Sequence, residues 1–346
     1  MKIVMVCAVV GAIYLFLLAP QYIKKFFPQK SINVLAWPAV IDSSEFEKFE
    51  RETGIKVYLT YFEDYEELIV KMNSGPGDYD LIMTSDYAVQ TLLKNNVVKP
   101  IDKTKLTFWN DLYKPLLNLY CDPDNKHTIP FAWEIYGIGI NKDYFKGIKP
   151  TPSWSILFEK GQSPTNVGML DDVREVISVA ALYLFGKDHD KKLTHDEINQ
   201  IKQLLIKQKP WVAMYNDLST DYLLISDTSA VVMGLSSDIY QAMREYDNID
   251  FIIPREGGFI LVDHFVIPAT CTNDDLVYQF LNFLYRPDVM SVYASRYYFF
   301  PVRTGVMGKK DHHMIRPTES LLSQLSFFNY QIPQEAVRSV WIALKS

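Results

Sequence analysis

Cysteine is scarce in this sequence, and the short motifs that mark common enzyme classes are missing. Only three of the 346 residues are cysteine, and no spacing among them matches a zinc site. Outside the N-terminal segment only Cys121 and Cys271 remain, which fits either a disulfide formed in an oxidising compartment or two free thiols. The chain also lacks a glycine-rich phosphate loop, a nucleophile elbow and a His-Glu-x-x-His motif. We therefore expect no enzyme, no metal and no cofactor.

Positive charge is in deficit as well. The chain has 35 Lys and Arg against 41 Asp and Glu, a net charge of −6. Four of the lysines lie in the first thirty residues, which contain no acid, so the remainder carries a net charge of −10. An acidic protein repels nucleic acid and attracts positively charged ligands over long distances. We therefore expect no nucleic-acid partner.

Only one apolar run approaches the length of a membrane span, and it lies at the N-terminus. A positively charged start precedes the apolar stretch 3–18, and Lys24 and Lys25 follow it. This pattern is typical of an export signal, or of a single span that is never cleaved, since a span needs roughly 17–25 residues. Pro20 disrupts the most obvious small-residue cleavage site. We therefore predict that residues 1–30 are a signal peptide or an N-terminal membrane anchor.

From residue 31 onward, short apolar runs alternate with helical patterns. We expect strands at 32–37, 55–60 and 79–84, each followed by a helix. This alternation predicts a parallel sheet with right-handed crossovers, in which ligands bind beyond the carboxyl ends of the strands. Trp37 and the turn Ser85-Asp86-Tyr87 fall at those ends. They are candidate binding residues, although such aromatic side chains lie more often in a core.

A second region follows Pro150. It contains a helix opened by a capping box, Thr194–Glu197, and strands near 230–233 and 259–268. No linker, repeat or low-complexity segment separates the two regions. We therefore predict that they exchange strands rather than follow each other in tandem.

The stretch 170–176 places acidic residues at the start of an apolar helix. Asp171 and Asp172 match a helix N-cap and first turn, where free backbone N–H groups favour a carboxylate. Asp172 and Glu175 are three residues apart and share one face of that turn. Such acids usually serve only as caps. A binding role for them needs support from elsewhere in the chain.

Asp263 provides part of that support. It is a lone acid within an otherwise apolar strand, and a buried carboxylate requires a charged or hydrogen-bonding partner. That partner is either a structural ion pair or a ligand. Aromatic residues at strand ends and loops, among them Tyr298, can hold an ammonium group, which contributes roughly 0.5–2 kcal/mol each. Together the acids and the aromatic residues indicate a site for an organic cation.

Several longer segments carry a resemblance to a known family. From about residue 31 to its end, the chain resembles the periplasmic spermidine/putrescine-binding proteins of bacterial ABC importers. The matching segments are FEKFERETGIKV (46–57), DYDLIMTSDY (78–87), IPFAW (129–133), SW (153–154), DDVREV (171–176), PREGG (254–258), VDHFVIPA (262–269) and LNFLYRPDV (281–289). The DDxREV box, combined with the later EGG and Asp segment, is the part most specific to the polyamine branch.

The resemblance implies an α/β architecture of the type II periplasmic-binding-protein fold, with two lobes joined by crossing hinge strands. Lobe 1 would comprise 31–137 plus 262–307, and lobe 2 would comprise 138–261 plus 308–346. It also implies a monomer that traps a polyamine, putrescine or spermidine, between its lobes and delivers it to an ABC permease in the inner membrane. The expected location is the periplasm, with the N-terminus either removed or retained as an inner-membrane anchor.

Carried over by position, the resemblance also implies a set of ligand-binding residues. They are Trp37, Ser85, Tyr87, Asp172, Glu175, Asp263 and Tyr298. The acids would face the amines, the aromatic residues would line the polymethylene chain, and the serine would lie at the edge of the cleft. This division of roles suits a flexible rod with cationic ends and an apolar middle.

Three positions depart from the family pattern. Val40 stands where the family usually has a tyrosine, and Leu235 and Leu261 stand where it usually has tryptophans. Aliphatic side chains keep an apolar wall but lose the attraction to cations, so the preferred amine stays open. The alternatives are a receptor for another small cationic amine, a membrane-held hydrolase that uses Asp172 and Glu175 as a carboxylate pair, and a sensor that reports to a membrane partner.

Overall fold

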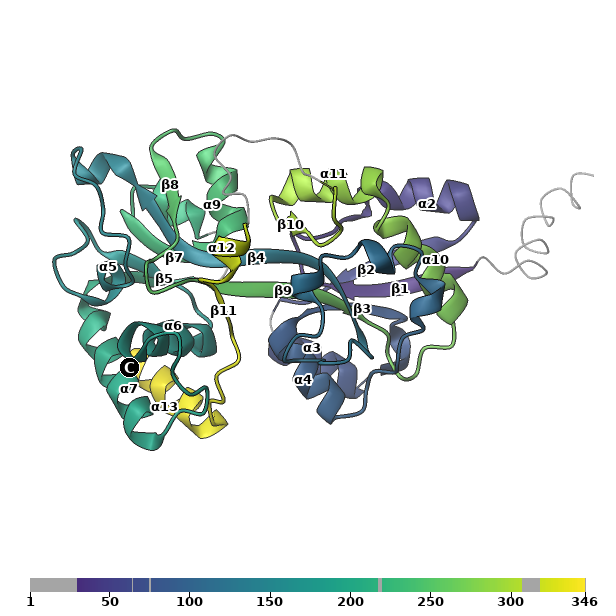
Figure 1. Ribbon diagram of the computed structural model, residues 1–346, viewed down its shortest axis with the longest axis horizontal. Helices are drawn as coiled ribbons and strands as arrows, with labels where there is room; N and C mark the ends of the chain where they lie inside the picture. The colour runs from purple at the N-terminus through teal and green to yellow at the C-terminus, as the bar shows by residue number, and fades with distance from the viewer. Residues whose placement is uncertain (1–29, 64, 75, 217–219, 307–317, 346) are drawn as a thin grey trace, which may run out of the picture.

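Two long strands, β4 (Thr128–Asn141) and β9 (Phe259–Val266), join two α/β lobes in the computed structural model (Figure 1). The structure describes residues 30–63, 65–74, 76–216, 220–306 and 318–345. The predicted signal or anchor, residues 1–30, lies outside these ranges apart from Lys30. Within them, no helix combines the length and the apolar character that crossing a membrane requires.

The first lobe, at the right of Figure 1, contains three parallel strands and the helices that cover them. Its strands are β1 (Ser31–Ala36), β2 (Lys56–Tyr61), β3 (Leu81–Ser85) and the short β10 (Phe300–Pro301). Its helices are α2 (Phe46–Thr53), α3 (Tyr65–Ser74), α4 (Asp86–Lys94), α10 (Asp274–Leu284) and α11 (Pro287–Tyr297).

The second lobe holds the remaining elements. Its strands are β5 (Val167–Met169), β6 (Val212–Tyr215), β7 (Val231–Leu235), β8 (Ile249–Ile252) and β11 (Ser326–Phe327). Its helices are α5 (Ser155–Phe158), α6 (Val173–Phe185), α7 (His195–Gln208), α8 (Asp221–Ile225), α9 (Ser236–Met243), α12 (Glu319–Leu322) and α13 (Gln334–Lys345).

The strands of both lobes form one mixed sheet, in the order β2-β1-β3-β9-β4-β7-β5-β6 along its main path. The prediction of a parallel sheet is right only within each lobe, where β1 pairs in parallel with β2 and β3, and β5 with β6 and β7. At the centre β9 runs antiparallel to β3 and β4. The predicted exchange of strands is confirmed, because β4 and β9 pass from one lobe to the other.

The full length of the strand β4 is the main feature that the sequence pattern did not predict. The strand begins at Thr128 and is buried along its whole length. Pro130 lies near its start, at a register shift in the pairing of β4 with β9. Proline cannot donate a ladder hydrogen bond and is tolerated in a sheet at such irregularities. The proline therefore masks the strand in a pattern-based prediction.

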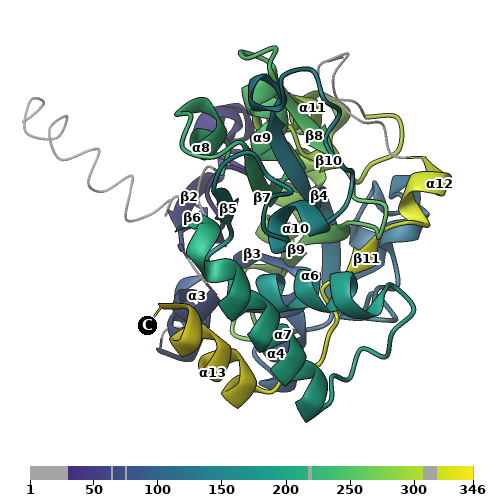
Figure 2. The ribbon, with the colours of Figure 1, turned by 90° about the vertical axis from the view of Figure 1, so that its left-hand side faces the viewer.

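Alternate side chains of β4 separate two hydrophobic cores. Ile135 belongs to a cluster that fills the first lobe and continues to α9, whereas Tyr136 and Ile138 belong to a second cluster. Helices α6, α7 and α13 cover the second cluster, and they lie together in Figure 2. Because strand side chains alternate between faces, the even-numbered residues of β4 mark the face on which α6 packs.

Local signals set several of the helix boundaries. Gly54 ends α2 in the left-handed conformation, with φ of 72°, which glycine adopts at little cost. Thr194 and Glu197 form the expected capping box of α7. Asp172 caps α6, while Asp171 pairs instead with Lys345 of α13 at 2.7 Å.

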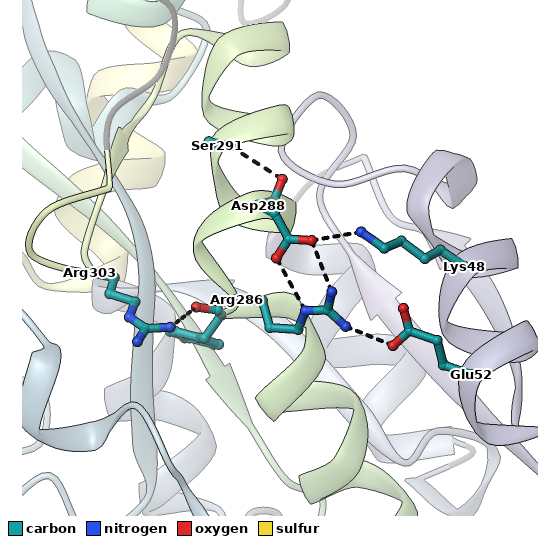
Figure 3. A network of polar contacts seen from close by, with 7 residues as sticks. Lys48, Glu52, Arg286, Asp288, Ser291 and Arg303 are labelled. Carbon is teal, nitrogen blue, oxygen red and sulfur yellow. Dashed lines mark hydrogen bonds and ion pairs between the residues drawn. The ribbon is translucent and has the colours of Figure 1, made fainter.

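Exposed ion pairs connect α2 to α11 across the outside of the first lobe (Figure 3). Arg286 contacts Glu52 at 2.7 Å and Asp288 at 2.9 Å, and Lys48 contacts Asp288 at 2.7 Å. Exposed pairs contribute about 0–1 kcal/mol each, so the network fixes orientation more than it adds stability.

Cys121 and Cys271 are both buried and free, so the disulfide alternative is wrong.

Candidate functional site

One face of the central sheet carries buried carboxyl groups. Asp263 of β9 lies opposite Ser85 of β3 on one side and Ala132 of β4 on the other. Two positions along, Glu134 of β4 lies opposite Leu261 of β9. Residues in register on paired strands point to the same side, so Ser85, Asp263 and Glu134 share one face. They are only 2%, 4% and 5% exposed, respectively.

Burial makes these carboxyls hard to ionise. It raises the pKa of Asp263 to about 7. Burial, with further contributions from Asp263 and Asp238, raises the pKa of Glu134 to about 8, although a hydrogen bond from Ser237 lowers it. Among the described residues, neither acid takes part in an ion pair. The structural ion pair considered for Asp263 is therefore absent from the described part of the chain.

Asp86, the first residue of α4, adds a third buried carboxyl beside Asp263. Burial raises its pKa to about 8, the Tyr120 hydroxyl and the backbone N–H of Tyr87 lower it, and Asp263 raises it further. Its side chain is fully buried. The carboxyl end of β3 and the start of α4 thus meet β9 and β4 at a strongly acidic position.

A second group of acids comes from α6 in the other lobe. Asp172 accepts hydrogen bonds from the backbone nitrogens of Arg174 at 2.7 Å and Glu175 at 3.1 Å, as an N-cap does. Glu175 is 7% exposed and accepts a 2.9 Å hydrogen bond from Tyr136 Oη on β4. The capping interpretation of Asp172 is therefore confirmed. A cap uses only part of a carboxylate's acceptor capacity, so it does not exclude a binding role.

Tyr87 of α4 lies between the two groups of acids. Burial raises the pKa of its phenol well above the usual value, and Asp172, Glu175 and Asp86 raise it further. Burial and Glu175 similarly raise the pKa of Tyr136. The start of α4, from the first lobe, and the start of α6, from the second, are therefore close enough for their acids to act on the same tyrosine. Two acidic groups separated by tyrosines are the arrangement that a cation with charged ends and an apolar middle requires.

Trp37 and Tyr298 lie near this region but have other described contacts. Trp37 follows β1 and packs on Phe62 with ring centroids 4.1 Å apart. Tyr298 ends α11 in the left-handed conformation, with φ of 59°, and its hydroxyl accepts a 3.2 Å hydrogen bond from Arg244 Nη1. The structure thus brings together Ser85, Tyr87, Asp263 and the α6 acids more directly than these two aromatic residues.

Two of the three departures from the family pattern, Leu235 and Leu261, lie on the same face of the sheet as Glu134. Leu235 lies opposite Tyr136 in the β4–β7 pair, and Leu261 lies opposite Glu134. Both leucines are partly buried against the second hydrophobic cluster, and Val40 is buried in the first. The leucines therefore share the acidic face and provide apolar surface without the attraction of an aromatic ring.

Glu134 and Tyr136 were not among the predicted binding residues, and Asp86 was predicted only as part of a turn. Glu134 carried a usable signal, because it is a lone acid in an apolar run, as Asp263 is. Tyr136 gave none, since a tyrosine in a strand is usually a core residue. Within the described residues, no group of His, Cys, Asp and Glu is arranged to hold a metal ion. The arrangement favours an organic cation.

Comparison with known proteins agrees with this geometry. The chain matches the bacterial extracellular solute-binding protein family over residues 46–314. It is 33% identical over 290 residues to the putrescine-binding periplasmic protein PotF of Escherichia coli (strain K12), covering 78% of this chain and 77% of that protein. It is 32% identical over 262 residues to the spermidine/putrescine-binding periplasmic protein of the same organism, covering 75% and 74%.

A solved structure bears on the fold. The spermidine/putrescine ABC transporter substrate-binding protein PotD from Streptococcus pneumoniae aligns with a TM-score of 0.78 at 21% identity, over 91% of this chain and 98% of that chain. The two-lobed type II fold expected from the sequence is therefore confirmed. The chain belongs to the bacterial extracellular solute-binding proteins, in the family that includes the periplasmic putrescine- and spermidine-binding proteins.

Proposed function

We propose that this protein is the extracytoplasmic receptor of an ABC importer, and that it binds a polyamine between its lobes and delivers it to a permease in the inner membrane. The observation that carries the proposal is the pair of acidic groups, one at Asp263 and one at the start of α6, with Tyr87 coupled to the second. Several relatives are named as putrescine- or spermidine-binding periplasmic proteins, which supports the same ligand class.

Each predicted residue has a role in this proposal. Asp263, with Ser85 beside it, holds one ammonium group, and Asp172 and Glu175 hold the other end of the ligand. A cation is the natural partner of Asp263, which is buried and makes no ion pair among the described residues, since ligand binding then restores the charge balance. Tyr87 contacts the methylene chain, and Trp37 and Tyr298 complete the walls as the lobes close.

The remaining assignments extend the proposal to the whole molecule. We assign 31–137 plus 262–307 to one lobe and 138–261 plus 308–346 to the other, with β4 and β9 as the hinge strands. The protein acts as a monomer in the periplasm, and residues 1–30 export it or hold it at the inner membrane. It has no catalytic role, and incubation with glycosides or amides should give no turnover.

Isothermal titration calorimetry of the full chain with putrescine, cadaverine, spermidine and spermine tests the proposal. We expect at least one of them to bind with a defined stoichiometry of one ligand per chain, and γ-aminobutyrate, which carries a carboxylate, to bind far more weakly. Absence of binding by all four amines would contradict a polyamine receptor. If a different small amine binds instead, the protein is still a receptor, and only the proposed ligand is wrong.

A further inference from the structure

Glu134 is a buried carboxyl among other acids, an environment that favours its ionised form only when a cation binds beside it. It lies in the buried strand β4, two residues beyond Ala132, the residue that pairs with Asp263, and therefore on the same face as Asp263. The titratable groups that face it are Asp263 from β9 and Asp238 from α9, and both are acids. Its described hydrogen-bond donor is the Ser237 hydroxyl at the start of α9. Glu134, Asp263 and Asp238 therefore form a group of neighbouring acids whose burial opposes ionisation.

Buried polar atoms beside this pair are also short of donors. Ser85 lies directly across from Asp263, and its Oγ makes no hydrogen bond of normal geometry although the Tyr87 hydroxyl is near. Asp86 Oδ2 likewise has no hydrogen bond of normal geometry. Buried oxygens without donors are rare in native proteins and call for an explanation. These two buried acceptors beside Asp263 match a ligand that is rich in N–H donors.

The number of carboxyls in the site can be compared with the number of positive charges on each class of polyamine. The two acidic groups contain five carboxyls, namely Asp86, Glu134 and Asp263 on one side and Asp172 and Glu175 on the other. A diamine supplies two positive charges, and a triamine or tetraamine supplies three or four. Glu134 and Asp263 are diagonal neighbours, whose Cβ atoms lie roughly 7–8 Å apart or less in such a pair. Two amines joined by a short methylene chain can match that spacing.

We propose that Glu134 is a specificity-determining residue, which gives up its proton when a further ammonium group of a triamine or tetraamine docks beside Asp263. This inference rests on the proposed polyamine-binding function and names the class of polyamine. Burial raises the pKa of Glu134 to about 8, so the carboxyl is mostly neutral near pH 7. A diamine that reaches only Asp263 leaves the Glu134 proton in place. A third amine displaces it and gains a charged partner.

Calorimetry of the full chain at pH 7, in buffers of different ionisation enthalpy, counts the protons released on binding. We expect spermidine or spermine to release about one more proton than putrescine, because Glu134 ionises only with the longer ligands. In Glu134→Gln the additional proton should disappear, and affinity for the longer amine should fall about tenfold or more while putrescine affinity changes little. Glu245→Gln, an exposed glutamate after α9, is the matched control.

Ser237→Ala provides a second test that keeps the carboxyl and removes only its donor. Loss of that hydrogen bond should raise the pKa of Glu134, so affinity for the longer amine should weaken at pH 7 and recover as the pH rises. If both variants release as many protons as the wild type and keep its preference among the amines, Glu134 has no role in specificity. The proposed receptor function would not be affected by that result. If the wild type binds no polyamine, the proposed function fails first, and this inference fails with it.

Discussion

Asp263→Asn is the most direct test of the acidic site, because asparagine preserves the size of the side chain and removes its charge. Ionising Asp263 in the unliganded protein is costly. Its pKa rises from the usual 3.8 to about 7, and one pKa unit corresponds to roughly 1.4 kcal/mol, so the cost is on the order of 4 kcal/mol. A bound ammonium group offsets that cost, and asparagine cannot provide the opposing charge.

The expected result therefore separates binding from stability. Removing one member of a buried charged pair typically costs about 2–5 kcal/mol, so affinity for polyamine should fall about 30-fold or more. The unliganded variant should melt at the same temperature as the wild type or higher, above pH 7, because it no longer buries an ionised carboxyl. Calorimetry and thermal melting measure the two quantities on the same samples.

The matched control is Asp247→Asn, a change of the same chemistry at an exposed position between α9 and β8. It should alter neither affinity nor melting temperature by much. Wild-type affinity in Asp263→Asn would refute the reasoning and place the cation elsewhere. A large fall in melting temperature without ligand would instead show that Asp263 holds the sheet together as a structural group.

Three further predictions follow from the same face of the sheet. Asp172→Asn should keep α6 capped, because asparagine is an equally good N-cap, and should still weaken polyamine binding tens-fold; unchanged affinity by calorimetry would leave Asp172 a cap only. Leu261→Trp should tighten binding by about 0.5–2 kcal/mol through the added aromatic face, and weaker binding would mean that the site lacks room. Small-angle scattering should show a smaller radius of gyration with ligand as β4 and β9 flex, and an unchanged radius at verified saturation would contradict hinge closure.

Local features of this chain were readable from the sequence because their causes are local. The end of α2 at Gly54 and the capping box at Thr194 each depend on a few neighbouring residues, and the capping box was predicted correctly. The full extent of β4 was not, since Pro130 interrupts its pattern and its partners are supplied by distant strands. The mixed character of the sheet was missed for the same reason.

The candidate site divides in a similar way. Asp263 stood out as a lone acid in an apolar strand, and its burial without an ion pair in the described residues agrees with that expectation. Glu134 carried the same signal, yet its importance depends on the register that sets it beside Asp263, which only the folded sheet fixes. The contact between Tyr136 and Glu175 likewise joins two elements that are separate in the sequence. Strand register and lobe packing are non-local and cannot be read from spacing.

The stability of the unliganded protein should depend on pH in a way that follows from the same buried groups. Glu134 and Asp263 have pKa values raised to about 8 and 7, so the folded state keeps protons that the unfolded state loses near pH 4. Their stabilising contribution is complete below pH 4 and is lost as the pH rises through 7 to 8.

His264, on the opposite face of β9, contributes with the reverse sign. Burial lowers its pKa to about 3, although Asp122 raises it, so its contribution is complete above about pH 6.5 and is lost as the pH falls. Between pH 6.5 and 8 only the acids still titrate among these groups, and the melting temperature of the unliganded protein should therefore fall across that interval. A polyamine should reverse the fall, because it favours the ionised carboxyls. The double variant Glu134→Gln/Asp263→Asn should make the fall in melting temperature smaller, and the remaining fall comes from Asp86 and Asp238, whose pKa values burial raises to about 8 and about 7. A wild-type melting temperature that rises from pH 6.5 to 8 would contradict the burial of these carboxyls.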